Sequence, residues 1–260
     1  MPRQASNKAS VQRGPRQSVW ASGFMTGGET PSLVGTLARC SNAGMHRTRR
    51  RLVTAGALAA ACTAMPALAS SRRILAPMTD GPFYPARAWR ERWSDWDADL
   101  TRVERDGRVL AARGEHLGLE AVVTDTRGRL IDGAEVEIWQ CDVMAAYRHP
   151  REASEAGRFD PGFQGFGAVR SDRQGAVRYR TIKPVPYPGR TPHIHVKLRH
   201  ASFGEMTSQL FIAGDLGNAR DFLWRQLEPQ DRAALEMALQ PAPAQSGLRW
   251  LVRQALTVPA

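Results

Sequence analysis

Short segments that alternate apolar and polar side chains, separated by turn residues, are the feature of this chain that most restricts its fold. Val136 and Ile138 fall on one face of an extended segment, and Glu135 and Glu137 fall on the other. Successive side chains of a strand point to opposite faces, so this pattern predicts a strand with one buried side. Gly, Pro and Asp recur between such segments, and few stretches have a helical period. The sequence therefore predicts a mainly β protein, an antiparallel β-sandwich.

The expected strands are short and lie in the second half of the chain. They cover residues 116–125, 134–140, 169–171, 176–182, 193–198, 209–212 and 247–257, the last of which could close the sheet. The turn at residues 172–175 joins two of them and predicts a hairpin. One short helix is expected at residues 229–239 and a second at 218–226, near the C-terminal end. The charged, Trp-rich residues 86–113 are expected to be irregular.

The N-terminal quarter of the chain differs in charge from the rest. Residues 1–69 hold nine of the 36 Lys and Arg and one of the 25 acidic residues, so the remainder carries +3 of the total charge of +11. Arg49 and Arg50 precede an apolar run at residues 52–65 and the small-residue motif 67–69, an arrangement that resembles a twin-arginine export signal with its cleavage site. An ordinary secretory signal and a buried helix are alternatives, and a lipoprotein anchor at Cys62 is a weaker one.

These features divide the chain into four parts. Residues 1–44 are expected to be an upstream or disordered extension ahead of the true start at Met45. Residues 45–69 are the export signal that would deliver the protein to the periplasm. Residues 70–113 form an N-terminal arm, and residues 114–260 form the β-sandwich domain.

Composition also excludes several classes of partner. A net charge of +3 beyond residue 69, without a basic and aromatic stripe, argues against nucleic acid. The apolar run is shorter than the roughly 20 residues of a membrane span, so no stable span is expected. Cys141 is the single cysteine after residue 69, which excludes a disulfide within the mature chain, and we expect it to be buried.

Two histidines and two tyrosines are candidates for a metal site. His193 and His195 share one face of an expected strand, about 6.6 Å apart, and Ile194 faces the core. Two imidazoles so placed can share one ion, although such pairs also occur on solvated strand faces. Tyr187 lies in a loop bracketed by prolines, which fix its direction, and Tyr147 lies in the loop after the strand at 134–140. Each tyrosine alone is more typical of a half-buried residue with a bonded hydroxyl. Together, two imidazoles and two phenolates suit ferric iron.

An ordered series of motifs carries a resemblance to a known family. The segment Arg190-Thr191-Pro192-His193-Ile194-His195 resembles the R-P-x-H-I-H box of intradiol ring-cleavage dioxygenases, most of all the iron-holding beta subunit of protocatechuate 3,4-dioxygenase. Further matching segments are residues 80–85, 136–140, 147–149, 159–161, 166–167, 180–188, 208–211 and 214–215. The resemblance spans about residues 78–225 in the family's order.

The resemblance implies a cofactor, a site and a reaction. It implies non-haem Fe(III) with the ligands Tyr147, Tyr187, His193 and His195. It implies that Tyr187 leaves the metal when substrate binds, and that Arg190 stabilises negative charge on the ring in a pocket also lined by Gln209. The implied reaction cleaves a catechol-type ring with O2 between its two hydroxyl-bearing carbons and gives a cis,cis-muconate-type diacid.

One departure from the family leaves the substrate open. Only Pro188 and Gly189 separate Tyr187 from Arg190, a shorter link than in protocatechuate enzymes. A protocatechuate-like substrate is favoured, with catechol, hydroxyquinol and larger catechols as alternatives. Either a homo-oligomer or a homologous second subunit is compatible with the sequence.

Two other functions are alternatives to the dioxygenase. One is a non-catalytic, transthyretin-like periplasmic binding module, against which the retention of both tyrosines and both histidines argues. The other is a zinc hydrolase built on the histidine pair, against which the lack of a nearby acidic ligand argues.

Overall fold

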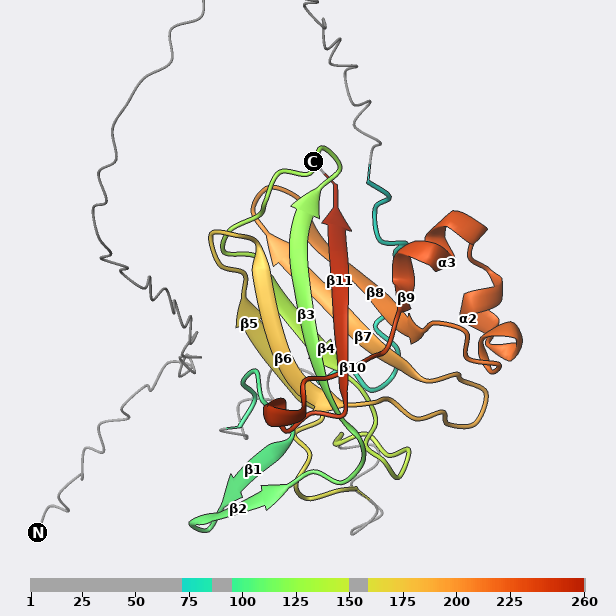
Figure 1. Cartoon of the computed structure of the whole chain (residues 1–260). Coiled ribbons are helices and arrows are strands. Elements are labelled where there is room, and N and C mark those ends of the chain that lie inside the picture. Colours follow the sequence, from blue (N-terminus) through green and yellow to red (C-terminus); the bar gives the residue numbers. More distant parts are fainter. Residues whose placement is uncertain (1–71, 86–94, 150–158, 260) are drawn as a thin grey trace, which may run out of the picture. The chain divides into compact units, whose positions relative to one another are not determined.

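The computed structural model describes residues 72–85, 95–149 and 159–259 (Figure 1). The expected extension at residues 1–44 and the expected export signal at 45–69 lie outside these described residues. So do residues 70–71 and 86–94 of the expected arm and residues 150–158 and 260 of the expected sandwich domain.

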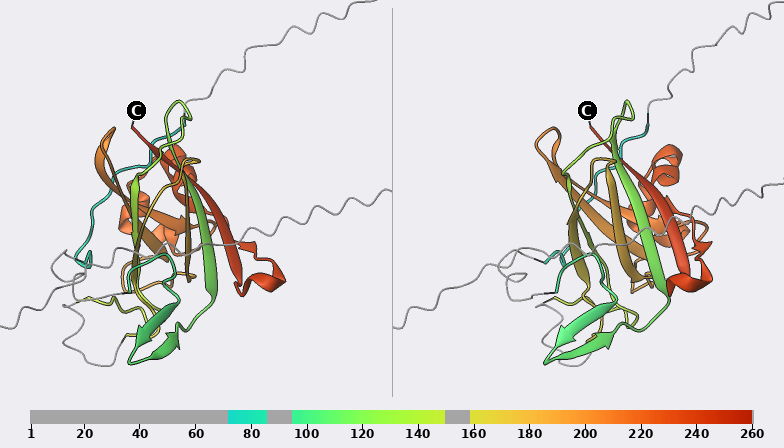
Figure 2. Two further views of the ribbon diagram at one scale, coloured as in Figure 1. Left: turned by 90° about the vertical axis from the view of Figure 1, so that its left-hand side faces the viewer. Right: turned by 60° about the vertical axis from the view of Figure 1, so that its left-hand side comes forward.

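Two β-sheets face each other and form a sandwich, as expected (Figures 1 and 2). The four-stranded sheet has the order β10 (Gln240–Pro241), β11 (Trp250–Val258), β3 (His116–Asp125) and β6 (Ala176–Ile182). The five-stranded sheet has the order β5 (Phe166–Arg170), β4 (Glu135–Trp139), β7 (His193–His200), β8 (Gly204–Ile212) and β9 (Glu236–Met237).

The apolar positions of the alternating segments fill the space between the sheets. Val136 and Ile138 of β4 and Ile194 and Val196 of β7 are buried in one cluster with side chains of β3 and β11. Strand alternation therefore leaves the odd-numbered residues of β7 on the opposite face of the five-stranded sheet. Cys141, just after β4, is buried as expected.

The prediction of a hairpin at residues 169–182 is wrong. β5 pairs with β4 in one sheet, whereas β6 pairs with β3 in the other, so the chain crosses between the sheets at this point. The connecting turn itself is tight: the Asp172 carboxylate accepts hydrogen bonds from the N–H groups of Gln174 and Ala176. A tight turn predicts a reversal of direction, but it does not determine which sheet receives the second strand.

Two strand pairs are parallel, in contrast to the purely antiparallel sandwich that we expected. β11 runs parallel to β3 and lies between β3 and β10, so it is an interior strand and does not close the sheet. β9 runs parallel to β8. Alternation along a strand carries no information on the direction of its neighbour, which is why these pairings were not predicted.

A third correction concerns residues 102–111, which were expected to be irregular. They form a hairpin of β1 (Arg102–Arg105) and β2 (Arg108–Ala111). Asp106 and Gly107 connect the strands with φ angles of 51° and 70°. An Asp-Gly pair with positive φ at both positions is a favoured two-residue hairpin turn. The Asp106-Gly107 pair is therefore a sequence signal for a hairpin, which the prediction of an irregular segment did not use.

Short helices occupy the C-terminal part, as predicted. The expected helix at residues 218–226 divides into a 3-10 turn, η1 (Asn218–Arg220), and α2 (Phe222–Arg225). The helix expected at residues 229–239 forms only over α3 (Pro229–Leu235), because the next two residues form β9. A further 3-10 turn, η2 (Ala244–Ser246), precedes β11. Among the described residues, no helix has the length and apolar character needed to cross a membrane.

Candidate metal centre

β7 brings the two predicted histidine ligands together. The Nε2 atoms of His193 and His195 are 3.2 Å apart, and both side chains are buried. They project from the same face of β7, as predicted, while Ile194 packs into the core. The Nδ1–H of His193 donates to the carbonyl of Thr191 over 2.7 Å. This bond leaves the Nε2 lone pair of His193 free to bind a cation.

Both predicted tyrosine ligands lie beside these histidines. The Tyr147 hydroxyl is 3.2 Å from Nε2 of His195, and its side chain is only 3% exposed. The Tyr187 ring lies 5.5 Å from the His193 ring and edge-on to Tyr147 at 5.8 Å. Residues from two loops and one strand thus form a four-residue cluster, which we call the ligand cluster: Tyr147, Tyr187, His193 and His195.

A buried carboxylate shapes the loop that carries Tyr147. Asp142 accepts hydrogen bonds from the backbone N–H groups of Met144 and Ala146, at 2.8 and 3.0 Å, and of Asp160. Ala145, between the first two donors, has a left-handed φ of 62°. Burial raises the pKa of the Asp142 carboxyl, and these bonds oppose that shift. The loop conformation therefore depends on one side chain.

Replacing Asp142 by alanine is expected to destabilise the protein and to loosen Tyr147. Three backbone donors would lose their acceptor, two of them in buried hydrogen bonds, at a cost of about 2–4 kcal/mol. Thermal unfolding and iron content after loading would measure the two effects. Asp172→Ala is the matched control, because this exposed carboxylate also accepts two backbone N–H groups but lies in a turn between the sheets. Equal losses in both variants would contradict the specific role of Asp142.

The short link between Tyr187 and Arg190 forms a tight turn. The two residues exchange backbone hydrogen bonds of 3.3 and 2.8 Å across Pro188 and Gly189. Proline at the second position and glycine with a φ of 80° at the third are typical of a type II turn. Nη1 of Arg190 lies 3.4 Å from the Tyr187 hydroxyl. The turn therefore places a cation directly beside one member of the ligand cluster.

Gln209 lies on the other side of Arg190. It pairs with His195 across β7 and β8, and its Oε1 accepts a 2.5 Å hydrogen bond from Nη2 of Arg190. The Nε2 of Gln209 is buried and has no hydrogen-bond partner among the residues that the structure describes. All six predicted site residues are therefore gathered in one place, and one of them keeps a free N–H donor.

The charges of the cluster are set by burial. Burial, together with the charge of Arg190, lowers the pKa of His193 to about 4 and that of His195 well below its ordinary value. Burial raises the pKa of Tyr147 and of Tyr187. Two neutral imidazoles with converging nitrogen atoms and two phenols in a desolvated pocket form a donor set that a hard cation fits, since a cation favours the phenolate form.

The tyrosines are essential to this assignment. In the described part of the chain, no group of three or more His, Cys, Asp and Glu side chains is placed to hold a metal ion. A site built from imidazole and carboxylate alone, such as the zinc hydrolase alternative would need, therefore has no support there.

Aromatic rings that the sequence analysis did not assign to the site surround the cluster. Phe83 stacks on Tyr147 at 4.6 Å, and Trp139 stacks on His195 at 4.6 Å with an angle of 11° between the rings. Tyr84 packs edge-on against Trp139. The available signals were the position of Phe83 in the 80–85 motif and the location of Trp139 on the outward face of its strand.

Salt bridges hold the N-terminal arm over the cluster. Asp80 pairs with the buried ammonium of Lys197 at 2.7 Å, and a Cβ atom at Gly81 would lie 3.6 Å from Cε1 of His195. Lys197 also lies 4.3 Å from the centre of the Tyr84 ring. Residues 80–84 thus form a wall of the site that shields the ligands from water.

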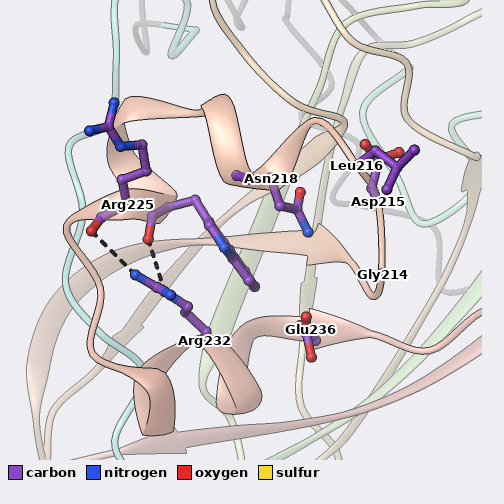
Figure 3. A pocket seen from close by; sticks show the side chains of 9 residues that line it. Gly214, Asp215, Leu216, Asn218, Arg225, Arg232 and Glu236 are labelled. Carbon is purple, nitrogen blue, oxygen red and sulfur yellow. Dashed lines mark hydrogen bonds between the residues drawn. The ribbon is translucent and has the colours of Figure 1, made fainter.

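A separate cavity of about 440 Å³ lies beside η1, α2 and β9 (Figure 3). Arg232 faces it and donates to the carbonyl oxygens of Trp224 and Arg225, so this cation ties the C-terminal end of α2 to α3. None of the six predicted site residues lines this cavity. It is therefore distinct from the ligand cluster.

Comparison with known proteins gives consistent matches. A family model described as Dioxygenase matches residues 80–237. The protocatechuate 3,4-dioxygenase beta chain of Burkholderia cepacia is 34% identical over 154 residues, which are 52% of this chain and 65% of that one. Hydroxyquinol 1,2-dioxygenase of Corynebacterium glutamicum is 26% identical over 45% of this chain and 43% of that one. The chain thus covers less than two thirds of each relative.

Solved structures share the fold. The dioxygenase domain of a carbohydrate-binding fusion protein from Streptomyces sp. SirexAA-E aligns with a TM-score of 0.52 and 23% identity, over 72% of this chain and 99% of that one. Catechol 1,2 dioxygenase of Acinetobacter radioresistens aligns with a TM-score of 0.53 and 18% identity, over 74% and 64% of the two chains. At these identities the likeness concerns the fold.

Proposed function

Because the chain belongs to the intradiol ring-cleavage dioxygenase family, we propose that it is an Fe(III)-dependent enzyme that cleaves a catechol-type ring with O2. Cleavage falls between the two hydroxyl-bearing carbons and gives a cis,cis-muconate-type diacid. One observation carries the proposal: Tyr147, Tyr187, His193 and His195 lie together, with aromatic rings packed against them.

The cofactor and its ligands have separate tasks in this proposal. A ferric ion held by the ligand cluster would act as a Lewis acid that activates a chelated catechol towards O2. Tyr147 is buried beneath Phe83 and is assigned as a fixed ligand with His193 and His195. Tyr187 is only partly buried and lies in a turn whose Pro188 and Gly189 are exposed. We assign it as the ligand that turns away when substrate binds and accepts a substrate proton.

Arg190 and Gln209 are assigned to the substrate. The guanidinium carries a delocalised positive charge, so it stabilises negative charge that develops on the ring. The free Nε2–H of Gln209 is a donor for a substrate oxygen. The aromatic wall formed by Phe83 and Trp139 keeps the dielectric constant low, which strengthens both interactions.

The name of the 34% identical relative favours a protocatechuate-like substrate. The short turn at residues 188–189 lies at the site and is the place where we expect the preference to be set. Substrate and O2 are the proposed partners, and a homo-oligomer or a homologous second subunit is compatible with the site. Family membership and the paired tyrosines disfavour the transthyretin-like binding module.

Oxygen uptake tests the function. Protein loaded with ferric iron is expected to be burgundy-red, because tyrosinate donates charge to iron, and to consume one O2 for each catechol. A panel of catechols with product mass spectrometry would identify the substrate. Protein that stays colourless and inactive after iron addition under native conditions would overturn the proposal.

We also propose that the protein is exported through the twin-arginine route, on the basis of residues 45–69. The mature protein is then expected in the periplasm with Ser70 as its first residue. N-terminal sequencing of the periplasmic form tests this, and an uncleaved cytoplasmic form would contradict it.

Tyr187→Phe is expected to weaken the visible band and to slow turnover by about 10²-fold, while iron is retained by the other three ligands. The variant loses the proton acceptor without losing ring packing against Tyr147. Visible spectra and steady-state kinetics on iron-quantified samples give the two readouts. Unchanged turnover would remove Tyr187 from the proposed mechanism.

A further inference from the structure

Asp221 is a fully buried carboxylate that contacts Arg190 at a different nitrogen from Gln209. Its Oδ2 accepts a 2.8 Å hydrogen bond from Nε of Arg190 and a 3.0 Å bond from the backbone N–H of Thr191. Its Oδ1 accepts bonds from the backbone N–H groups of Leu223 and Trp224, at 2.9 and 3.1 Å. The carboxylate therefore joins Arg190 to the start of α2.

The contacts of Arg190 fix the plane of its guanidinium. Nε binds Asp221, Nη2 binds Gln209, and Nη1 lies near the Tyr187 hydroxyl. The ring of Phe222 lies 5.4 Å from the guanidinium carbon. Because a guanidinium is rigid and planar, bonds at Nε and Nη2 determine its orientation. With the Nε bond removed, the side chain could rotate about its remaining contacts.

We propose that Asp221 is a positioning residue that holds Arg190 in the orientation needed for ring cleavage. This inference rests on the proposed function, since it gives Asp221 a role in the same site. Among the described residues Asp221 makes no hydrogen bond to the ligand cluster, although its charge opposes the lowering of the His193 pKa by burial. We assign its effect on turnover to the contact with Arg190. A preorganised charge acts on the transition state more than on the bound substrate, so the turnover number should depend on Asp221 more than KM does.

Asp221→Asn separates the orientation of Arg190 from the capping of α2. Asparagine caps helices as well as aspartate does, so its Oδ1 can keep the bonds from Leu223 and Trp224. Its Nδ2 then faces Nε of Arg190 and the backbone N–H of Thr191. Two donors cannot bond, so the variant loses both hydrogen bonds that Oδ2 accepts. We expect kcat to fall about 10- to 100-fold. KM, iron content, the visible band and the anaerobic spectral change on catechol binding are expected to stay close to wild type.

A double-mutant cycle gives the decisive comparison. In an Arg190→Ala background, Asp221→Asn is expected to change kcat by less than about 2-fold, because a residue that acts through Arg190 has nothing left to position. Multiplicative losses in the double variant would overturn the proposal. Asp231→Asn is the control, because Asp231 lies in the first turn of α3 and pairs with Arg73, outside the site. It is expected to have wild-type kcat.

Arg190→Lys covers the case in which Asp221→Asn does not fold. Lysine keeps a positive charge next to Asp221 but lacks the planar fork, so a loss of kcat of at least about 10-fold with an intact visible band is expected. Wild-type kcat in either Asp221→Asn or Arg190→Lys overturns the positioning role. If the iron-loaded wild-type protein has no band and consumes no O2 with any catechol, the proposed function itself fails.

Discussion

Tyr147→Phe is expected to lower the iron content and the iron-dependent colour strongly and to lower kcat by about 10³-fold or more. The phenol is the buried oxygen donor of the ligand cluster, 3.2 Å from Nε2 of His195. A metal ion that activates a substrate lowers the activation free energy by several kcal/mol, and each 1.4 kcal/mol corresponds to about a factor of ten in rate. Phenylalanine fills the same volume under Phe83, so the fold should persist. Iron analysis, visible spectra and oxygen uptake measure the outcome.

Tyr179→Phe is the matched control for this variant. Tyr179 is equally buried, and its hydroxyl donates to the carbonyl of Val136 at 2.6 Å within the core. Its loss should lower the free energy of unfolding by about 1 kcal/mol without affecting iron or activity. If Tyr147→Phe retained both iron and its colour, the ligand assignment would be wrong.

Arg190→Ala is expected to lower kcat by about 10²- to 10³-fold while the visible band remains. It should also destabilise the protein, because Asp221 stays buried after its charged partner is removed. Breaking a buried ion pair from one side costs about 3–5 kcal/mol, and the three backbone donors that remain on Asp221 place the expected loss at the lower end. Urea unfolding of iron-free protein measures stability separately from activity.

Arg129→Ala provides the comparison for stability. Arg129 pairs with Asp125, another carboxylate that lies in the interior and also accepts backbone N–H groups. The two variants therefore both leave a buried carboxylate without its arginine. Only Arg190→Ala should lose activity, and equal kinetic defects would mean that the effect of Arg190 is a general loss of stability.

The local elements of this fold follow from short-range patterns. Expected strands at 116–125 and 176–182 coincide with β3 and β6, because a period of two is encoded by consecutive residues. The partners of those strands depend on packing between distant segments. That is why the crossing between β5 and β6 and the parallel β3–β11 pair were not predicted.

The site residues also divide into those that follow from local patterns and those that depend on contacts between distant segments. The shared face of His193 and His195 follows from strand geometry. The two tyrosines were predicted as ligands because the motifs around them resemble those of the family in the same order. Asp221 was missed because its role comes from a contact with Arg190, 31 residues earlier. The ring of Trp139 was missed for a similar reason, since stacking on His195 requires the register of β4 against β7.

The parallel pair of β3 and β11 has a consequence for how the protein reaches this fold. Trp250 pairs with Leu117, 133 residues earlier, so a long loop must close before the first bond of the pair can form. Topologies dominated by such distant contacts fold slowly, on a scale of milliseconds to seconds. Until β11 arrives, β3 presents an unpaired edge that can associate with other chains. We therefore expect the pairing of β11 with β3 to be the slow step in forming the sandwich.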